Sequence, residues 1–121
     1  MEIALFDSYT DFDTAPSGSV TVDLPADAGD ASDYFALKMA DDSMAPVYAK
    51  GQIVVFKKQR KAPRETTVFA AVGKDLYVRK ISYDKDFLSL IPENSAYEKL
   101  DFTGFSLNRV KVKGVAVKAL D

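Results

Sequence analysis

The strongest constraint on the fold is a series of short apolar segments that end at glycine, proline or charged residues. Residues 34–39 place Phe35, Leu37 and Met39 on one face and Tyr34, Ala36 and Lys38 on the other, which is the period of a β-strand. No stretch keeps a helical period over three turns, so we expect a mainly β fold: short strands curled into a sheet or small barrel around one core. The segments that predict strands are 19–24, 34–39, 52–58, 66–72, 75–84, 87–92 and 109–120.

Two local signals refine this prediction. Residues 72–75 (VGKD) predict a tight hairpin between two of the strands. Gly114 interrupts the apolar pattern of 109–120, and a glycine inside a strand indicates a bulge or a bend.

The chain divides by composition near residue 33. Residues 1–33 are rich in Asp, Ser, Ala, Gly and Pro, which predicts an extended linker arm with one short strand at 19–24. Residues 34–121 carry the other strand signals and are expected to form the domain proper, within a length of 121 residues that suits one hydrophobic core.

The composition excludes several kinds of chemistry. Without cysteine or histidine the chain has no disulfide, no thiolate metal site and no Ser-His-Asp triad, so we expect neither a metal nor a cofactor. Catalysis would have to use carboxylates, lysine or a Ser-Lys pair. No apolar run is long enough to span a bilayer and the start lacks a signal-peptide pattern, which predicts a soluble, cytoplasmic protein without a membrane partner.

The charge distribution contains one basic segment, 57–64 (KKQRKAPR), in a chain of net charge −2. The net negative charge argues against DNA binding by this chain alone. The segment has two interpretations, a patch that contacts phosphates or a solvated loop between strands. Pro63 and the lack of aromatic residues favour the loop.

Four segments carry a family resemblance: 35–56 (FALKMADDSMAPVYAKGQIVVF), 76–81 (LYVRKI), 90–97 (LIPENSAY) and 112–120 (VKGVAVKAL). Their order and spacing resemble the C-terminal domain shared by LexA, phage CI-type repressors and UmuD, the S24-type Ser-Lys autopeptidase fold. The resemblance implies a single LexA/signal-peptidase-like β domain that pairs subunits. In most members a helix-turn-helix domain, which this sequence does not show, binds operator DNA.

The resemblance also implies site residues. The family uses a serine nucleophile and a neutral lysine as general base, and Ser43 stands at the nucleophile position. The base position, directly after a strand valine, holds Arg79, and an arginine guanidinium is effectively never deprotonated in proteins. Lys80 is the alternative base, but neighbours in a strand point to opposite faces, so Lys80 would need a bulge. Asp41 stands where the family often has glycine.

The substrate bond is a second departure from the family pattern. Family members cut an Ala-Gly or Cys-Gly bond in the arm, near the level of residues 6–12, where this chain has none. Its only Ala-Gly bond, Ala28–Gly29, lies much nearer to Ser43 and is expected to form a loop. We therefore expect self-cleavage to be defective, with Arg79 either filling the base pocket beside Asp41 or Asp42, or facing solvent.

Three functions follow as alternatives. The first is the dimerisation and regulatory domain of a phage-type or LexA-like transcriptional repressor, a homodimer or larger homo-oligomer, with RecA of the SOS response or an antirepressor as further candidate partners. The second is an active autopeptidase that uses Ser43 and Lys80. The third is a UmuD-like accessory protein that binds a polymerase. Candidate interfaces are the strand at 110–120, Tyr97 and Phe102.

Overall fold

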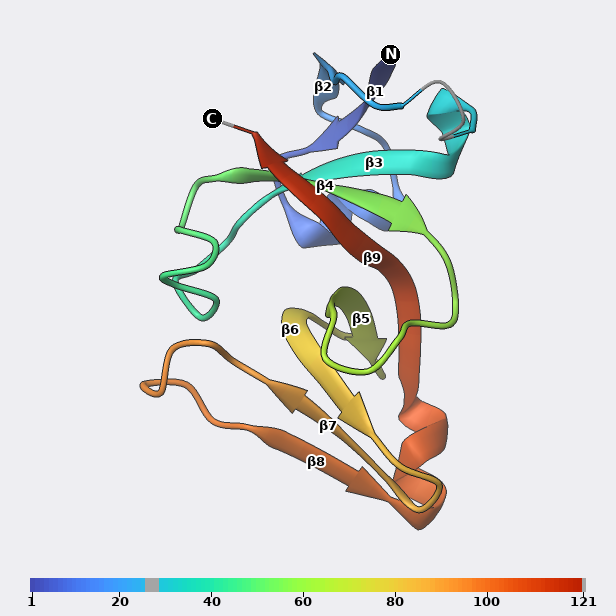
Figure 1. The fold of residues 1–121 in the computed structure, drawn as a ribbon, viewed down its shortest axis with the longest axis vertical. Helices are drawn as coiled ribbons and strands as arrows, with labels where there is room; N and C mark the ends of the chain where they lie inside the picture. Colours follow the sequence, from blue (N-terminus) through green and yellow to red (C-terminus); the bar gives the residue numbers. More distant parts are fainter. Residues whose placement is uncertain (26–28, 121) are drawn as a thin grey trace.

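The computed structural model describes residues 1–25 and 29–120, which form one open, nine-stranded sheet (Figure 1). The strand order is β2-β1-β3-β4-β9-β5-β6-β7-β8. β1 pairs with β3 in parallel, whereas every other neighbouring pair is antiparallel. The mainly β fold predicted from the sequence is confirmed, as a curled sheet rather than a closed barrel. The strands are β1 (Glu2–Phe6), β2 (Gly18–Thr21), β3 (Tyr34–Lys38), β4 (Ile53–Lys58), β5 (Thr67–Val72), β6 (Asp75–Tyr83), β7 (Phe87–Ile91), β8 (Leu100–Thr103) and β9 (Val110–Leu120).

Three short 3-10 helices connect the strands: η1 (Tyr9–Asp13), η2 (Ala31–Asp33) and η3 (Gly104–Arg109). No helix in the described part of the chain is both long and apolar enough to cross a membrane.

Two strands were missed by the sequence analysis. β1 lies in the Asp- and Ser-rich segment for which a single strand was expected, and it joins the sheet beside β3. β8 has four residues, of which only Phe102 is buried, so its alternation is too short to stand out. The predicted hairpin is confirmed, because Val72 pairs with Asp75 across two residues and Gly73 takes the positive φ of 61° that such a turn requires.

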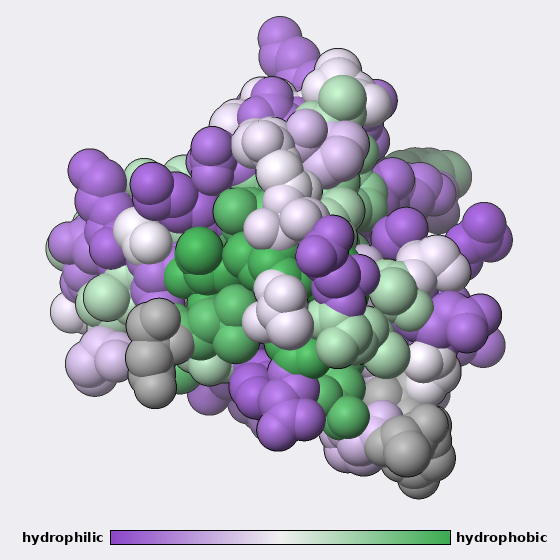
Figure 2. Space-filling view, turned by 90° about the horizontal axis from the view of Figure 1, so that it is seen from above, coloured by the Kyte–Doolittle hydropathy of each residue, from purple (hydrophilic) through white to green (hydrophobic). Residues whose placement is uncertain are grey.

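The two faces of β3 bury side chains in two different clusters, and the predicted alternation assigns these side chains to the correct faces. Phe35, Leu37 and Met39 belong to the central core inside the curl of the sheet, which includes Phe56 and Phe69 from β4 and β5. A second, smaller cluster lies on the outer face of this half of the sheet. Its buried members are Ile3, Val22, Tyr34, Ala36 and Val55. Figure 2, which looks onto this end of the molecule, shows hydrophobic residues at the middle of a face edged with hydrophilic ones.

β9 joins the two halves of the sheet, as Figure 1 shows. It pairs with β4 over Gly114–Leu120 and with β5 over Val110–Val115. The register to β5 shifts between Val112 and Gly114, which confirms the irregularity predicted at this glycine. A Cβ on Gly114 would lie 2.8 Å from the Phe35 ring and 3.0 Å from the Lys57 carbonyl oxygen, so the glycine lets strand and ring approach.

Candidate functional site

Ser43 lies in the loop that connects β3 with β4. The loop is closed at its base by two backbone hydrogen bonds, from Met39 N to Gln52 O (2.9 Å) and from Gly51 N to Met39 O (2.8 Å). Gly51 has a φ of 85°, a conformation that favours glycine. Met44 is buried in the central core, so the residue next to Ser43 fixes the loop to the body of the domain.

Arg79 reaches Ser43 from β6. The pairing of β6 with β5 is regular, with Val68 opposite Arg79 and Thr67 opposite Lys80, so no bulge turns the strand here. The Arg79 guanidinium is buried, and its Nη1 donates hydrogen bonds to Ser43 Oγ (2.7 Å) and to the Val78 carbonyl (2.9 Å).

Asp41 completes a hydrogen-bonded chain with Ser43 and Arg79. Ser43 Oγ donates to Asp41 Oδ1 at 2.6 Å, and the Ser43 backbone N–H donates to the same oxygen at 3.0 Å. The Ser43 hydroxyl therefore accepts a hydrogen bond from the Arg79 guanidinium and donates its own proton in a hydrogen bond to the Asp41 carboxylate. Arg79 reaches Asp41 through Ser43.

Two tyrosine rings surround the buried charge of Arg79. Its Cζ lies 5.2 Å from the centroid of Tyr77 and 5.7 Å from that of Tyr97, within the range of a cation–π contact. Arg79 Nε is buried without a hydrogen-bond partner in the described chain. The rings and the nearby carboxylates offset part of the cost of burying the cation.

The loop after β7 holds the other side of the site. Asn94 N donates to Ser43 O (2.9 Å) and Asn94 Nδ2 to Asp42 O (3.1 Å), while Tyr97 Oη donates to Asp42 Oδ1 (2.7 Å). This last bond raises the pKa of Tyr97. Residues 90–97 were predicted to carry part of the family resemblance, but no role was predicted for Asn94, and for Tyr97 only a place in a candidate interface. The signal that could have pointed to them is the PENSAY pattern at 92–97, which lies in one of the segments that carry the family resemblance.

Tyr9, in η1, covers a further edge of the serine loop. Its hydroxyl accepts a hydrogen bond from Ala40 N (3.2 Å) and donates to Met39 Sδ (3.8 Å). Burial raises the pKa of Tyr9, which keeps the phenol neutral. The segment before residue 33 thus contributes directly to the surroundings of Ser43.

Lys80 lies on the opposite side of β6 from Ser43. Its Nζ is 3.7 Å from Glu65 and 3.7 Å from Glu93, in two partly exposed ion pairs. The structure brings Ser43 and Arg79 together and keeps Lys80 apart from them. The Ala28–Gly29 bond includes Ala28, which lies outside the described residues.

A comparison with protein families gives one match. A family model described as Peptidase S24-like matches residues 8–117, which is most of the chain. The chain belongs to the Peptidase S24-like family. Comparison with curated proteins gives no match. The predicted resemblance is therefore confirmed, and the match starts well before residue 34.

Within this Peptidase S24-like domain, the serine loop and the 90–97 loop form one hydrogen-bonded unit against β6. A lysine beside a serine could accept the serine proton once burial made it neutral. An arginine at the same place donates to the serine and cannot become neutral.

Proposed function

We propose that this chain is the dimerisation and regulatory domain of a phage-type or LexA-like repressor that has lost self-cleavage. The observation that carries the proposal is the 2.7 Å hydrogen bond from Arg79 to Ser43, at the place where the family resemblance implies a lysine base. Operator DNA would be bound through a helix-turn-helix outside this chain, in the cytoplasm. Assembly would then be the remaining task of the domain, because linked heads bind paired half-sites more tightly.

The chemistry of the serine supports the loss of catalysis. Nucleophilic attack needs a base that takes the hydroxyl proton. Asp41 accepts the hydrogen bond of that hydroxyl, but a carboxylate is a far weaker base than an alcohol requires. Lys80, the base of the alternative autopeptidase, is engaged with Glu65 and Glu93 instead.

We expect Arg79→Lys to leave the chain intact, because the arm lacks the Ala-Gly or Cys-Gly bond at the level where family members are cut. The test is intact-mass spectrometry over several days, at neutral pH and at pH about 10, where the deprotonated fraction of a lysine amine is much larger than at neutral pH. The controls are the unchanged chain and the double variant Ser43→Ala/Arg79→Lys. Mass loss in Arg79→Lys that the double variant abolishes would show that the arm can be cut.

An active autopeptidase based on Lys80 makes a different prediction for the same measurement. The unchanged chain would then lose mass with time, and both Ser43→Ala and Lys80→Gln would stop the loss. An exposed control, Lys85→Gln, would not stop it.

The surface near β8 supports self-association. β8 is an edge strand of the sheet, and Phe105, just beyond it in η3, is 94% exposed. Phe87 on β7, which pairs with Thr103, is also exposed. Exposed aromatic residues beside a strand edge are typical of interaction surfaces. Phe102, one of the predicted interface residues, is instead buried in a third hydrophobic cluster, which also contains Ile81 and Leu90.

We expect sedimentation equilibrium in the micromolar range to show a reversible dimer or a larger assembly, and Phe105→Glu to weaken association by at least tenfold. Val47→Glu, at an exposed apolar residue of the loop between β3 and β4, is the control with the same change of charge. Weakening by Val117→Glu but not by Phe105→Glu would move the interface to β9, the strand predicted from the sequence. A strict monomer at all concentrations would contradict the proposed assembly role.

A further inference from the structure

Part of β9 has an open edge. β9 pairs with β5 from Val110 onward, but its ladder with β4 starts only at Gly114, opposite Lys58. After Lys58 the chain leaves the sheet for the loop at 59–66. On the β4 side, residues 110–113 of β9 therefore have no ladder partner in the part of the chain that the structure describes.

A groove lies between this open edge and the loop. Its lining comes from the end of β4, the start of the loop, η1 and the start of β9, and half of the lining residues are cations while none is an acid. These residues are Phe12, Lys58, Gln59, Arg60, Val110, Lys111, Val112 and Lys113. None of the four cations takes part in an ion pair within the described residues.

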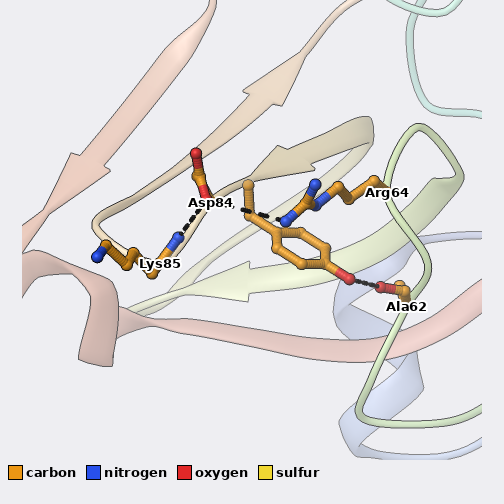
Figure 3. Close-up of polar contacts among 5 residues, drawn as sticks. Ala62, Arg64, Asp84 and Lys85 are labelled. Carbon is orange, nitrogen blue, oxygen red and sulfur yellow. Dashed lines mark hydrogen bonds and ion pairs between the residues drawn. The ribbon is translucent and has the colours of Figure 1, made fainter.

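The loop that forms the far wall of the groove is fixed rather than loosely attached (Figure 3). Tyr83 Oη donates to the Ala62 carbonyl at 2.8 Å, and the Arg64 guanidinium lies over the Tyr83 ring, 3.9 Å from Asp84. Gln59 Nε2 also donates to the Lys61 carbonyl at 2.6 Å. The basic segment 57–64 is thus an ordered wall beside the strand edge.

We propose that this groove binds an extended, acidic peptide segment of a partner protein, which adds a short strand to the open edge of β9. An exposed edge offers backbone donors and acceptors to such a strand, and the neighbouring side chains select its sequence. Lys111 and Lys113 are two residues apart, so acidic residues at alternate positions of an added strand can face them together. Lys58 and Arg60 supply charge from the opposite wall.

A peptide is favoured over a nucleic acid by two observations. The unpaired feature is a strand edge, which a peptide backbone can match and a phosphodiester backbone cannot. The lining also has only one aromatic residue, Phe12, whereas grooves for single-stranded nucleic acids combine cations with aromatic platforms for several bases.

The probe for the test is a fluorescent peptide with glutamate and valine at alternate positions, measured by fluorescence anisotropy on the intact chain. We expect saturable binding that Lys111→Gln/Lys113→Gln weakens at least tenfold. The control double variant Lys50→Gln/Lys85→Gln removes the same charge from other exposed sites and should change affinity less than twofold. Equal weakening by the two double variants would overturn the proposal.

Two N-methylated versions of the peptide test for strand addition itself. Each carries methyl groups on one set of alternate amides, which keeps every charge but removes the donors of one edge. One version should bind at least tenfold more weakly than the other, because an added strand uses one edge. Equal binding by both versions would contradict the proposal. So would displacement of the labelled peptide by a random-sequence DNA duplex as effectively as by the unlabelled peptide, because the groove would then bind polyanions in general.

Discussion

Replacing Phe35 with alanine is expected to lower the free energy of unfolding by about 3–5 kcal/mol, the usual cost of deleting a buried aromatic ring. Phe35 has no exposed surface and stands at the centre of the aromatic core. Its ring is stacked on Phe56 at 5.4 Å and lies 4.6 Å from Phe12 and 6.0 Å from Phe69. Because these three rings come from different elements, they cannot all close in on the vacated space.

Urea unfolding measures this loss, with Phe105→Ala as the matched control. Phe105 is 94% exposed, so the same substitution should change stability by less than about 0.5 kcal/mol. Both variants are measured in dilute solution, so that association does not contribute. Similar losses for the two variants would contradict the described core.

Gly114→Ala is expected to cost about 2–3 kcal/mol, although it adds a single methyl group. Overpacking of a filled core costs about 1–3 kcal/mol, and here the new atom meets both a fully buried ring and a backbone carbonyl. The contacts would be 2.8 Å to two atoms of the Phe35 ring and 3.0 Å to Lys57 O. Neither neighbour is the end of a flexible side chain, so the strand or the ring must shift.

Gly18→Ala provides the comparison, because a Cβ at Gly18 meets nothing within 4 Å. Its free energy of unfolding should stay within about 0.5 kcal/mol of the unchanged chain. The double variant Gly114→Ala/Phe35→Leu adds a further check, since the smaller side chain makes room for the methyl group. Its loss should be smaller than the sum of the two single losses, as for residues in contact.

The strands were largely predictable from the sequence, whereas their partners were not. The alternation of residues 34–39 predicted correctly which side chains share a face, because the period of a strand is a local property. The position of β9 between β4 and β5 depends on pairs of residues far apart in the sequence, such as Ile53 and Leu120, and no local sequence pattern predicts such pairs. The parallel pairing of β1 with β3 was missed for the same reason.

Only those residues of the candidate site to which the family resemblance gave a role were predicted from the sequence. The resemblance pointed to Ser43 and Arg79, and the structure places them in hydrogen-bond contact. The roles of Asn94 and Tyr97 arise because a distant loop folds against Asp42 and Ser43, a contact that neither segment encodes alone. Whether the serine cleaves a bond stays a prediction, to be decided by the mass measurements above.

The double pairing of β9 has a consequence for how the domain folds. Hairpins such as β5–β6 and β6–β7 can form early because their partners are close in sequence, and the antiparallel contact of β3 with β4 spans only one loop. The two halves become one sheet only when β9 joins both, and pairs such as Ile53 with Leu120 close very long loops. Contacts of this kind slow folding, since the entropy of loop closure is lost before the contacts are gained. We therefore expect the pairing of β9 with β4 and β5 to limit the folding rate. The backbone amides in these ladders should exchange their hydrogens with solvent only when the whole domain unfolds.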